Sequence, residues 1–206
     1  MPIYYHSLYN RGAVLVRDSL RAENKGDDSF GQFTYRNFYG ARSRWTRQTV
    51  LTAEGVMVVR DEYRPCADVD GYQASPCWLL MAEGELSPAG RNWFDAPARD
   101  HAWWQKQKKR VLLYLHPGAG LSIGQVAHRA SQDIGGATHN AFARAVVRAG
   151  KPQVWLSVLV PFNEGGEAGE LAGQIRTSVD EKGLVTATTG KLKIKISAAG
   201  AWSVNR

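Results

Sequence analysis

The sequence has little cysteine and no long apolar run without charge. Its two cysteines, Cys66 and Cys77, lack CxxC spacing, so they do not indicate a zinc site, and a single disulfide between them stays open. No segment reaches the roughly 20 apolar residues of a membrane-spanning helix, and no basic segment followed by an apolar core marks a signal peptide. These absences predict a protein without membrane insertion. They also fit a piece cut from a longer chain.

Acidic residues are fewer than basic ones. There are 19 Asp and Glu against 26 Lys and Arg in 206 residues, which gives a formal net charge of +7. Such an excess favours a partner rich in negative charge, such as acidic polysaccharide, nucleic acid or an anionic surface. Charge alone does not choose among them, and it also fits a basic protein that simply stays soluble.

Common catalytic motifs are missing as well. The sequence has no GxGxxG or P-loop, and the glycine-rich "HPGAGLSIG" lacks the following GK pair. No two histidines have i, i+2 or i, i+4 spacing, so a metal site would have to be assembled by the fold. The histidines are His6, His101, His116, His128 and His139. We expect a structural role for His116, which precedes Pro117 at a strand end.

Strand patterns dominate what is present. With 7 Trp, 8 Tyr and 21 Gly, the composition favours short strands and tight turns. Runs rich in β-branched or aromatic residues predict strands over Ala13–Asp18, Phe30–Phe38, Arg42–Thr52, Val56–Tyr63, Tyr72–Met81, Arg110–His116 and Pro152–Pro161. We expect a loop over 83–100. The pattern weakens over 120–150, where 142–148 fits a strand or a short helix.

The clearest pattern lies near the C-terminus. After a turn of helix at 169–172, it predicts strands over Gln174–Val179, Leu184–Thr189, Lys191–Ser197 and Ala201–Val204. In the third of these, leucine and isoleucine alternate with lysine, as in a half-buried strand. Many strands without strand–helix alternation predict an all-β fold for residues 1–206. We expect one domain, an antiparallel two-sheet β-sandwich of the supersandwich type with little helix.

The segment "RSRWTRQTVLTAEGVMVVRDEYR", residues 42–64, predicts a hairpin with an unusual concentration of arginine. Arg42 and Arg44 share one strand face, while Trp45 and Arg47 share the other. Arginine holds carboxylates with two parallel hydrogen bonds, so Arg42 and Arg44 are candidate ligands for an anionic substrate.

The other face of this hairpin has two interpretations. Trp45 and Arg47 could bind a sugar ring and its carboxylate, or they could belong to the scaffold. We favour the scaffold. Trp45 is then expected in the core, and Arg47 is expected to pair with Asp61 or Glu62 across the hairpin.

A second candidate region is "HAWWQKQKKR", residues 101–110. Aromatic rings beside cations suit a sugar chain or single-stranded nucleic acid, because both offer stackable units along a charged backbone. The candidate substrate-binding residues are His101, Trp103, Trp104, Lys106 and Lys108. A solvated strand edge, whose lysines deter edge pairing, explains the charges equally well.

The order of several segments resembles a known family. "YHSLYNRGAVLVRDS", "FTYRNFYGARSRWTRQTVLTAEGVMVVRDEYR", "CWLLM", "VLLYLHP" and "VWLSVLVPF" follow one another as in the C-terminal all-β region of heparinase II/III-like polysaccharide lyases, which include oligoalginate lyases. Arg47, Val58, Asp61 and Trp78 stand in the order of that pattern. The resemblance spans roughly 5–161 and is one of strand order more than of catalytic residues.

This resemblance implies β-elimination on uronic-acid polymers and a periplasmic or secreted location. The family's catalytic Tyr, His and Asn come mainly from a preceding helical toroid, and its β-region carries a structural zinc. Here there is no toroid and no H-x-H, and His6 is the one position that matches a zinc ligand. We therefore expect the chain to depend on an upstream helical domain for catalysis and to be inactive alone.

Three functions follow from these patterns. The first is a lyase-related β-sandwich that binds or acts on acidic, uronate-containing polysaccharide. The second is a stand-alone carbohydrate-binding or structural module without catalysis. The third is a single-stranded nucleic-acid binder.

Overall fold

The chain is mostly β-strand in the computed structural model, which describes residues 14–15, 20–36, 42–81, 91–96, 109–129, 137–163 and 166–206. One short α-helix is present, α1 (Ala168–Gln174), together with a 3-10 turn at Ala67–Val69. All the strand pairs in the described residues are antiparallel.

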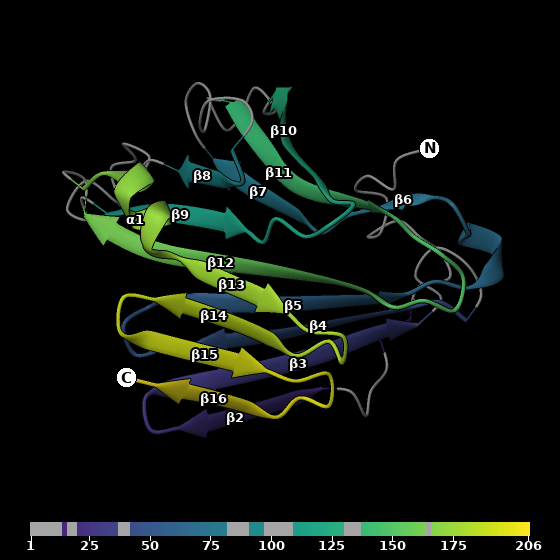
Figure 1. Cartoon of the computed structure of the whole chain (residues 1–206), viewed down its shortest axis with the longest axis horizontal. Helices are drawn as coiled ribbons and strands as arrows, with labels where there is room; N and C mark the ends of the chain where they lie inside the picture. The colour runs from purple at the N-terminus through teal and green to yellow at the C-terminus, as the bar shows by residue number, and fades with distance from the viewer. Residues whose placement is uncertain are drawn as a thin grey trace.

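The largest sheet has eight strands in the order β1-β3-β4-β5-β12-β9-β8, with β2 also paired to β3 (Figure 1). Its strands are β1 (Val14–Leu15), β2 (Arg21–Lys25), β3 (Asp28–Arg36), β4 (Arg44–Leu51), β5 (Met57–Arg64), β8 (Trp93–Ala96), β9 (Lys109–Leu115) and β12 (Gln153–Asn163). The predicted hairpin forms β4 and β5. Strand β12 lies between β5 and β9, so it joins the two halves of the sheet.

A C-terminal meander covers one face of this sheet. It consists of β13 (Arg176–Val179), β14 (Val185–Thr189), β15 (Leu192–Ile196) and β16 (Trp202–Asn205). Leu192, Ile194 and Ile196 are buried against the large sheet, while Lys193 faces solvent, so the predicted alternation is confirmed. Trp202 stacks on Phe30 of the large sheet with ring centroids 5.9 Å apart.

A third sheet covers part of the opposite face. It has the order β10-β11-β6, with β7 also on β11, and its strands are β6 (Gln73–Ala74), β7 (Cys77–Met81), β10 (Ser122–Arg129) and β11 (Ala137–Val146). The small side chains of Ala141, Ala143 and Ala145 pack in one buried cluster with Trp45 and Trp155. The predicted all-β antiparallel sandwich is confirmed, and the structure adds this third layer.

Some predicted boundaries were wrong. Strand β8 lies within the expected loop 83–100, where buried Phe94 pairs with Leu113 of β9. Residues 142–146, where both a strand and a short helix were open, are strand, and all of β10 was missed. Strand β2, whose sequence "RAENK" is polar and mostly exposed, was missed because an exposed edge strand has no apolar alternation.

Candidate functional site

Three polar rows cross strands β3, β4 and β5 on the face that carries the meander. In a sheet, directly paired residues on neighbouring strands point to the same face, so each row is a set of side-chain neighbours. From the core outward the rows are Gln32–Gln48–Arg60, Thr34–Thr46–Glu62 and Arg36–Arg44–Arg64. The next row inward, Phe30–Val50–Val58, is apolar and buried. The face therefore changes from apolar to strongly basic along the strands.

The inner row is a buried chain of hydrogen bonds. Gln48 donates from Nε2 to Oε1 of Gln32 at 2.8 Å, and Arg60 donates from Nη1 to Oε1 of Gln48 at 3.1 Å. Arg60 is fully buried and also donates from Nε to the carbonyl oxygen of Gly183 in the β13–β14 turn, at 2.8 Å. Because its donors have partners, the charge is tolerated in the interior, and it ties the meander to the large sheet.

In the middle row, Glu62 is the charged residue, and it pairs with two arginines. Arg60 donates from Nη2 to Oε2 of Glu62 at 2.5 Å, and Arg64 pairs with Oε1 of the same carboxylate. Burial opposes ionisation of this carboxyl, but the two guanidiniums outweigh it and hold its pKa below the ordinary value. Glu62 is therefore a carboxylate that links a buried arginine to an exposed one.

The outer row places three arginines on neighbouring strands. Arg36, Arg44 and Arg64 are all exposed, and within the described residues no ion pair joins Arg36 or Arg44 to a carboxylate. Like charges directly opposite on paired strands destabilise a sheet. Two strand spacings of about 4.8 Å give the row a length of about 10 Å. The row therefore concentrates positive charge on an exposed face of the sheet.

Arg42 differs from the prediction that it shares a strand face with Arg44. Strand β4 begins at Arg44, and Arg42 lies before it with a φ of 73°. A positive φ is uncommon for a residue other than glycine. Arg42 is exposed and makes contacts of its own, so it borders the row without being part of it.

The opposite face of the same strands is aromatic and closed. Asp61 accepts hydrogen bonds at Oδ1 from Trp45 Nε1 at 2.9 Å and from Arg47 Nε at 2.8 Å, and at Oδ2 from Arg47 Nη2 at 2.9 Å. Trp45 is buried and stacks on Trp155, with centroids 5.3 Å apart. The scaffold interpretation of Trp45 and Arg47 is confirmed, with Asp61 rather than Glu62 as the partner.

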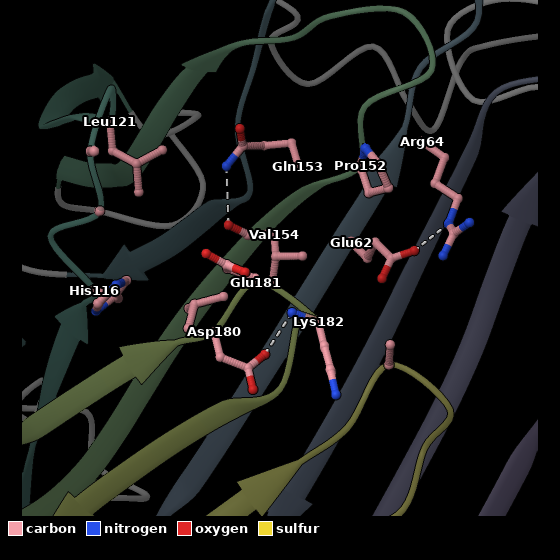
Figure 2. Close-up of a pocket in the computed structure, with 15 residues that line it drawn as sticks. Glu62, Arg64, His116, Leu121, Pro152, Gln153, Val154, Asp180, Glu181 and Lys182 are labelled. Atoms are coloured by element: carbon pink, nitrogen blue, oxygen red, sulfur yellow. Dashed lines mark hydrogen bonds and ion pairs between the residues drawn. The ribbon is translucent and has the colours of Figure 1, made fainter.

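A pocket of about 380 Å³ adjoins the arginine row beyond Arg64. Figure 2 shows the Glu62–Arg64 pair on one side, the turn Asp180–Lys182 below and His116 on the other side. The lining residues are Glu62, Arg64, His116, Gly118, Ala119, Leu121, Pro152, Gln153, Val154, Val179, Asp180, Glu181, Lys182, Gly183 and Ala198.

His116 is the histidine that lines this pocket. Its Nδ1 lies 2.9 Å from Oγ1 of Thr177 on β13, which leaves Nε2 for another partner. Burial lowers the pKa of the imidazole below its ordinary value of 6.5, so the ring is neutral at pH 7. The predicted structural role of His116 at a strand end agrees with its contact to the meander, and its place in the pocket adds to that role.

The other predicted site residues lie outside the described part of the chain. These are His101, Trp103, Trp104, Lys106, Lys108 and the candidate zinc ligand His6. Among the described residues no group of three or more His, Cys, Asp or Glu side chains could hold a metal ion, so these residues do not form a zinc site. Cys66 has a free thiol. Within the described ranges, no helix has the length and apolar character to cross a membrane.

Sequence reasoning missed Arg36, Arg60 and Arg64. A signal for two of them was present, because pairing across the 53–55 turn places Arg64 opposite Arg44 and Arg60 opposite Gln48. The place of Arg36 depends on the pairing of β3 with β4, which residues 37–43 between these strands do not fix.

Comparison with known proteins supports the fold. No family model and no curated protein matches the sequence. Among solved structures, the chain is similar to the heparan sulfate lyase HepC from Pedobacter heparinus, with a TM-score of 0.60 and 13% identity over 90% of this chain and 28% of that chain. It is also similar to the heparinase III gene product BT4657 (TM-score 0.58, 12% identity, 94% of this chain, 27% of that chain).

A further heparinase III structure gives a TM-score of 0.57 and 11% identity, over 94% of this chain and 27% of that chain. The chain therefore spans less than a third of the length of these lyases. At such low identity the likeness establishes the fold, which is that of a β-sandwich segment found in heparin and heparan sulfate lyases. The resemblance stated from the strand order agrees with it at this level.

Proposed function

We propose that residues 1–206 form one lyase-related β-sandwich domain that binds acidic polysaccharide through the arginine row Arg36–Arg44–Arg64. The observation that carries this proposal is the register of the three arginines, which brings like charges together on an exposed face. The likeness to heparan sulfate lyase structures supports a polysaccharide ligand over other anions.

The chemistry of the row suits carboxylate or sulfate groups. A guanidinium offers parallel N–H donors that match the two oxygens of such a group, and it stays charged at any physiological pH. Arg64 is oriented by Glu62, whereas Arg36 and Arg44 have no carboxylate partner among the described residues. A charged sugar polymer lying across the strands would therefore meet its strongest attraction at Arg36 and Arg44.

Catalysis would need more than this row. β-Elimination requires the uronate carboxylate to be neutralised, a base for the ring proton next to it, and an acid for the leaving oxygen. The row would supply the first requirement. In this proposal the acid and the base come from an upstream helical domain, so the chain alone binds the polymer without cleaving it.

The test is calorimetric titration of the protein with heparan sulfate, alginate, hyaluronan and polyglucuronate. We expect the double variant Arg36→Gln/Arg44→Gln to bind about tenfold more weakly than wild type, because it loses about two charge-assisted hydrogen bonds of modest net value. The matched control is Lys191→Gln/Lys193→Gln, which removes the same charge from the exposed lysines of the meander.

Equal losses for the two double variants would overturn the role of the row, because net charge alone would then explain binding. Tighter binding of a single-stranded oligonucleotide than of any polysaccharide would favour the nucleic-acid interpretation instead. Appearance of the ultraviolet absorbance of an unsaturated uronate would show that the chain cleaves its ligand, and it would contradict the required helical domain.

A further inference from the structure

We propose that the pocket beside Arg64 binds one uncharged, hydroxyl-rich sugar unit, as a subsite distinct in character from the arginine row. This inference rests on the proposed function in one respect, which is that the ligand is a saccharide. It adds a second site and assigns it a different kind of sugar.

The charges of the pocket balance, unlike those of the row. Its acidic groups are Glu62, Asp180 and Glu181, and its cations are Arg64 and Lys182, with buried Arg60 directly behind Glu62. His116 adds no charge at neutral pH. A site without net charge offers no special attraction to an anion, so it favours a neutral polar ligand.

The shape and the lining also suit a sugar ring. A volume of about 380 Å³ lies within the usual range for small-molecule sites of about 300–1,000 Å³. Leu121, Pro152 and Val154 provide apolar contact, and His116 and Lys182, which also line the pocket, carry hydrogen-bonding groups. A sugar ring has apolar C–H faces and a rim of hydroxyls that both donate and accept. Neutral His116 can likewise donate or accept at Nε2.

Hydrogen bonds within the protein hold one wall of the pocket in place. Asp180 Oδ1 accepts hydrogen bonds from the backbone N–H groups of Lys182 at 2.9 Å and Leu184 at 2.8 Å. The same turn is fixed to the large sheet by the bond from Arg60 to the carbonyl oxygen of Gly183. A preorganised wall reduces the entropy that binding would otherwise cost.

Pocket and row form one continuous surface. The pocket lies over β9, β12 and β5, and the row lies over β5, β4 and β3, which are consecutive strands of the large sheet. Five strands span about 19 Å at about 4.8 Å each. A single polysaccharide molecule could therefore place a neutral sugar unit in the pocket and an anionic unit on Arg44, with Arg64 between them.

The test uses two-dimensional NMR of ¹⁵N-labelled protein titrated with glucose, galactose, mannose and N-acetylglucosamine, and separately with glucuronate. We expect at least one neutral sugar to give saturable shifts at the amides of Gly118, Leu121 and Lys182, and glucuronate to bind more weakly than that sugar. Absence of saturable shifts with all four neutral sugars, or tighter binding of glucuronate, would overturn the proposal.

Two variants locate the ligand. Ala119→Trp fills the pocket from an exposed loop position, so the shifts should disappear, whereas Ala53→Trp makes the same change at the far end of the β4–β5 hairpin and should keep them. His116→Phe keeps a ring of similar size but removes Nε2, and it should weaken binding about tenfold. Both pocket variants must retain wild-type dispersion of the remaining amide signals. Unchanged affinity in Ala119→Trp would contradict the site.

The proposal for the arginine row and the proposal for the pocket can be disproved independently of each other. The variant Arg36→Gln/Arg44→Gln should bind the neutral sugar as wild type does, because neither residue lines the pocket. If polymer binding does not depend on the row while the neutral sugar still binds, the row assignment fails and the pocket stands. If the row is needed but no neutral sugar binds, the pocket proposal fails alone.

Discussion

The two faces of the β4–β5 hairpin each hold an arginine–carboxylate pair, and the two pairs differ in what surrounds them. On the aromatic face, Asp61 has 1% of its side chain exposed and takes all its described hydrogen bonds from Trp45 and Arg47. On the polar face, Glu62 has 8% exposed, but its second partner Arg64 has 59% exposed. In the first pair the arginine, Arg47, has 27% of its side chain exposed, about half the exposure of Arg64 in the second pair, which connects the interior to the surface.

The comparison shows how strand alternation separates two uses of the same residue types. Asp61 and Glu62 are adjacent in the sequence, so their side chains point to opposite faces. One face buries its carboxylate, Asp61, beside aromatic rings, while Arg47 stays partly exposed. The other extends a chain of polar contacts from the meander to the exposed arginines. Four predictions test this difference, beginning with the largest expected effect.

Asp61→Ala should be the most destabilising change. It leaves the indole N–H of buried Trp45 and most of the Arg47 guanidinium without their partner, and breaking a buried ion pair in this way costs about 3 kcal/mol. Urea unfolding followed by tryptophan fluorescence measures the loss. As a control, Arg47→Met/Asp61→Ala should lose less than the sum of the single variants. A loss below about 1 kcal/mol for Asp61→Ala would contradict the closed arrangement.

Glu62→Gln should cost less, about 2 kcal/mol, because buried Arg60 keeps its bonds to Gly183 and Gln48. Arg64 is largely exposed, so its share is small, and Arg64→Gln should change the free energy of unfolding by only about 0.5 kcal/mol. Urea unfolding of both variants checks this order. Equal costs for the two would mean that the pair depends on its surface partner rather than on Arg60.

Gly183→Ala should cost about 2 kcal/mol for two reasons. Gly183 has a φ of +73°, and an added Cβ would lie 2.9 Å from Nη2 of Arg60. Gly120 is a matched control, because its φ is +76° and nothing lies within 4 Å of an added Cβ. Gly120→Ala should therefore cost only about 1 kcal/mol, which is the conformational part. Equal changes in the midpoint of thermal unfolding for the two variants would show that an added Cβ at position 183 does not clash with Arg60.

The smallest effect is a pH dependence near the pocket. The pKa of His116 is lowered by burial, so the unfolded chain binds a proton more readily than the folded protein below pH 6.5. The stability from this group is therefore complete above pH 6.5 and is lost as the pH falls from there toward the folded-state pKa. Unfolding midpoints between pH 7.5 and pH 5 measure it, and the slope should diminish in His116→Phe. An unchanged slope would assign the dependence to another group.

The regions that sequence reasoning predicted well have short turns and strict alternation. In the meander, Leu192, Ile194 and Ile196 point inward because apolar and charged residues alternate, and each strand pairs with its neighbour in the sequence. The Arg47–Asp61 pair was within reach for the same reason, since one turn fixes the register of the whole hairpin.

The regions that it missed depend on partners far along the chain. Strand β11 contains Ala141, Ala143 and Ala145, which carry no strand signal but fit against the large rings of Trp45 and Trp155. Gly124 of β10 is explained in a similar way, because an added Cβ would lie 2.8 Å from Cζ of Phe142 on the neighbouring strand. The alanines follow from packing between sheets and Gly124 follows from a pairing within one sheet, and no local pattern encodes either.

The central place of β12 has a consequence for how the chain reaches its native state. Met57 of β5 pairs with Leu159 of β12, and the two residues stand roughly a hundred positions apart. Pairings between such distant segments require the closure of long loops, which slows folding. During synthesis, the free edge of β5 stays unpaired until the ribosome has released residues 153–163. Until then this valine-containing edge is open to association with other chains, so the order of synthesis exposes the chain to aggregation before β12 emerges.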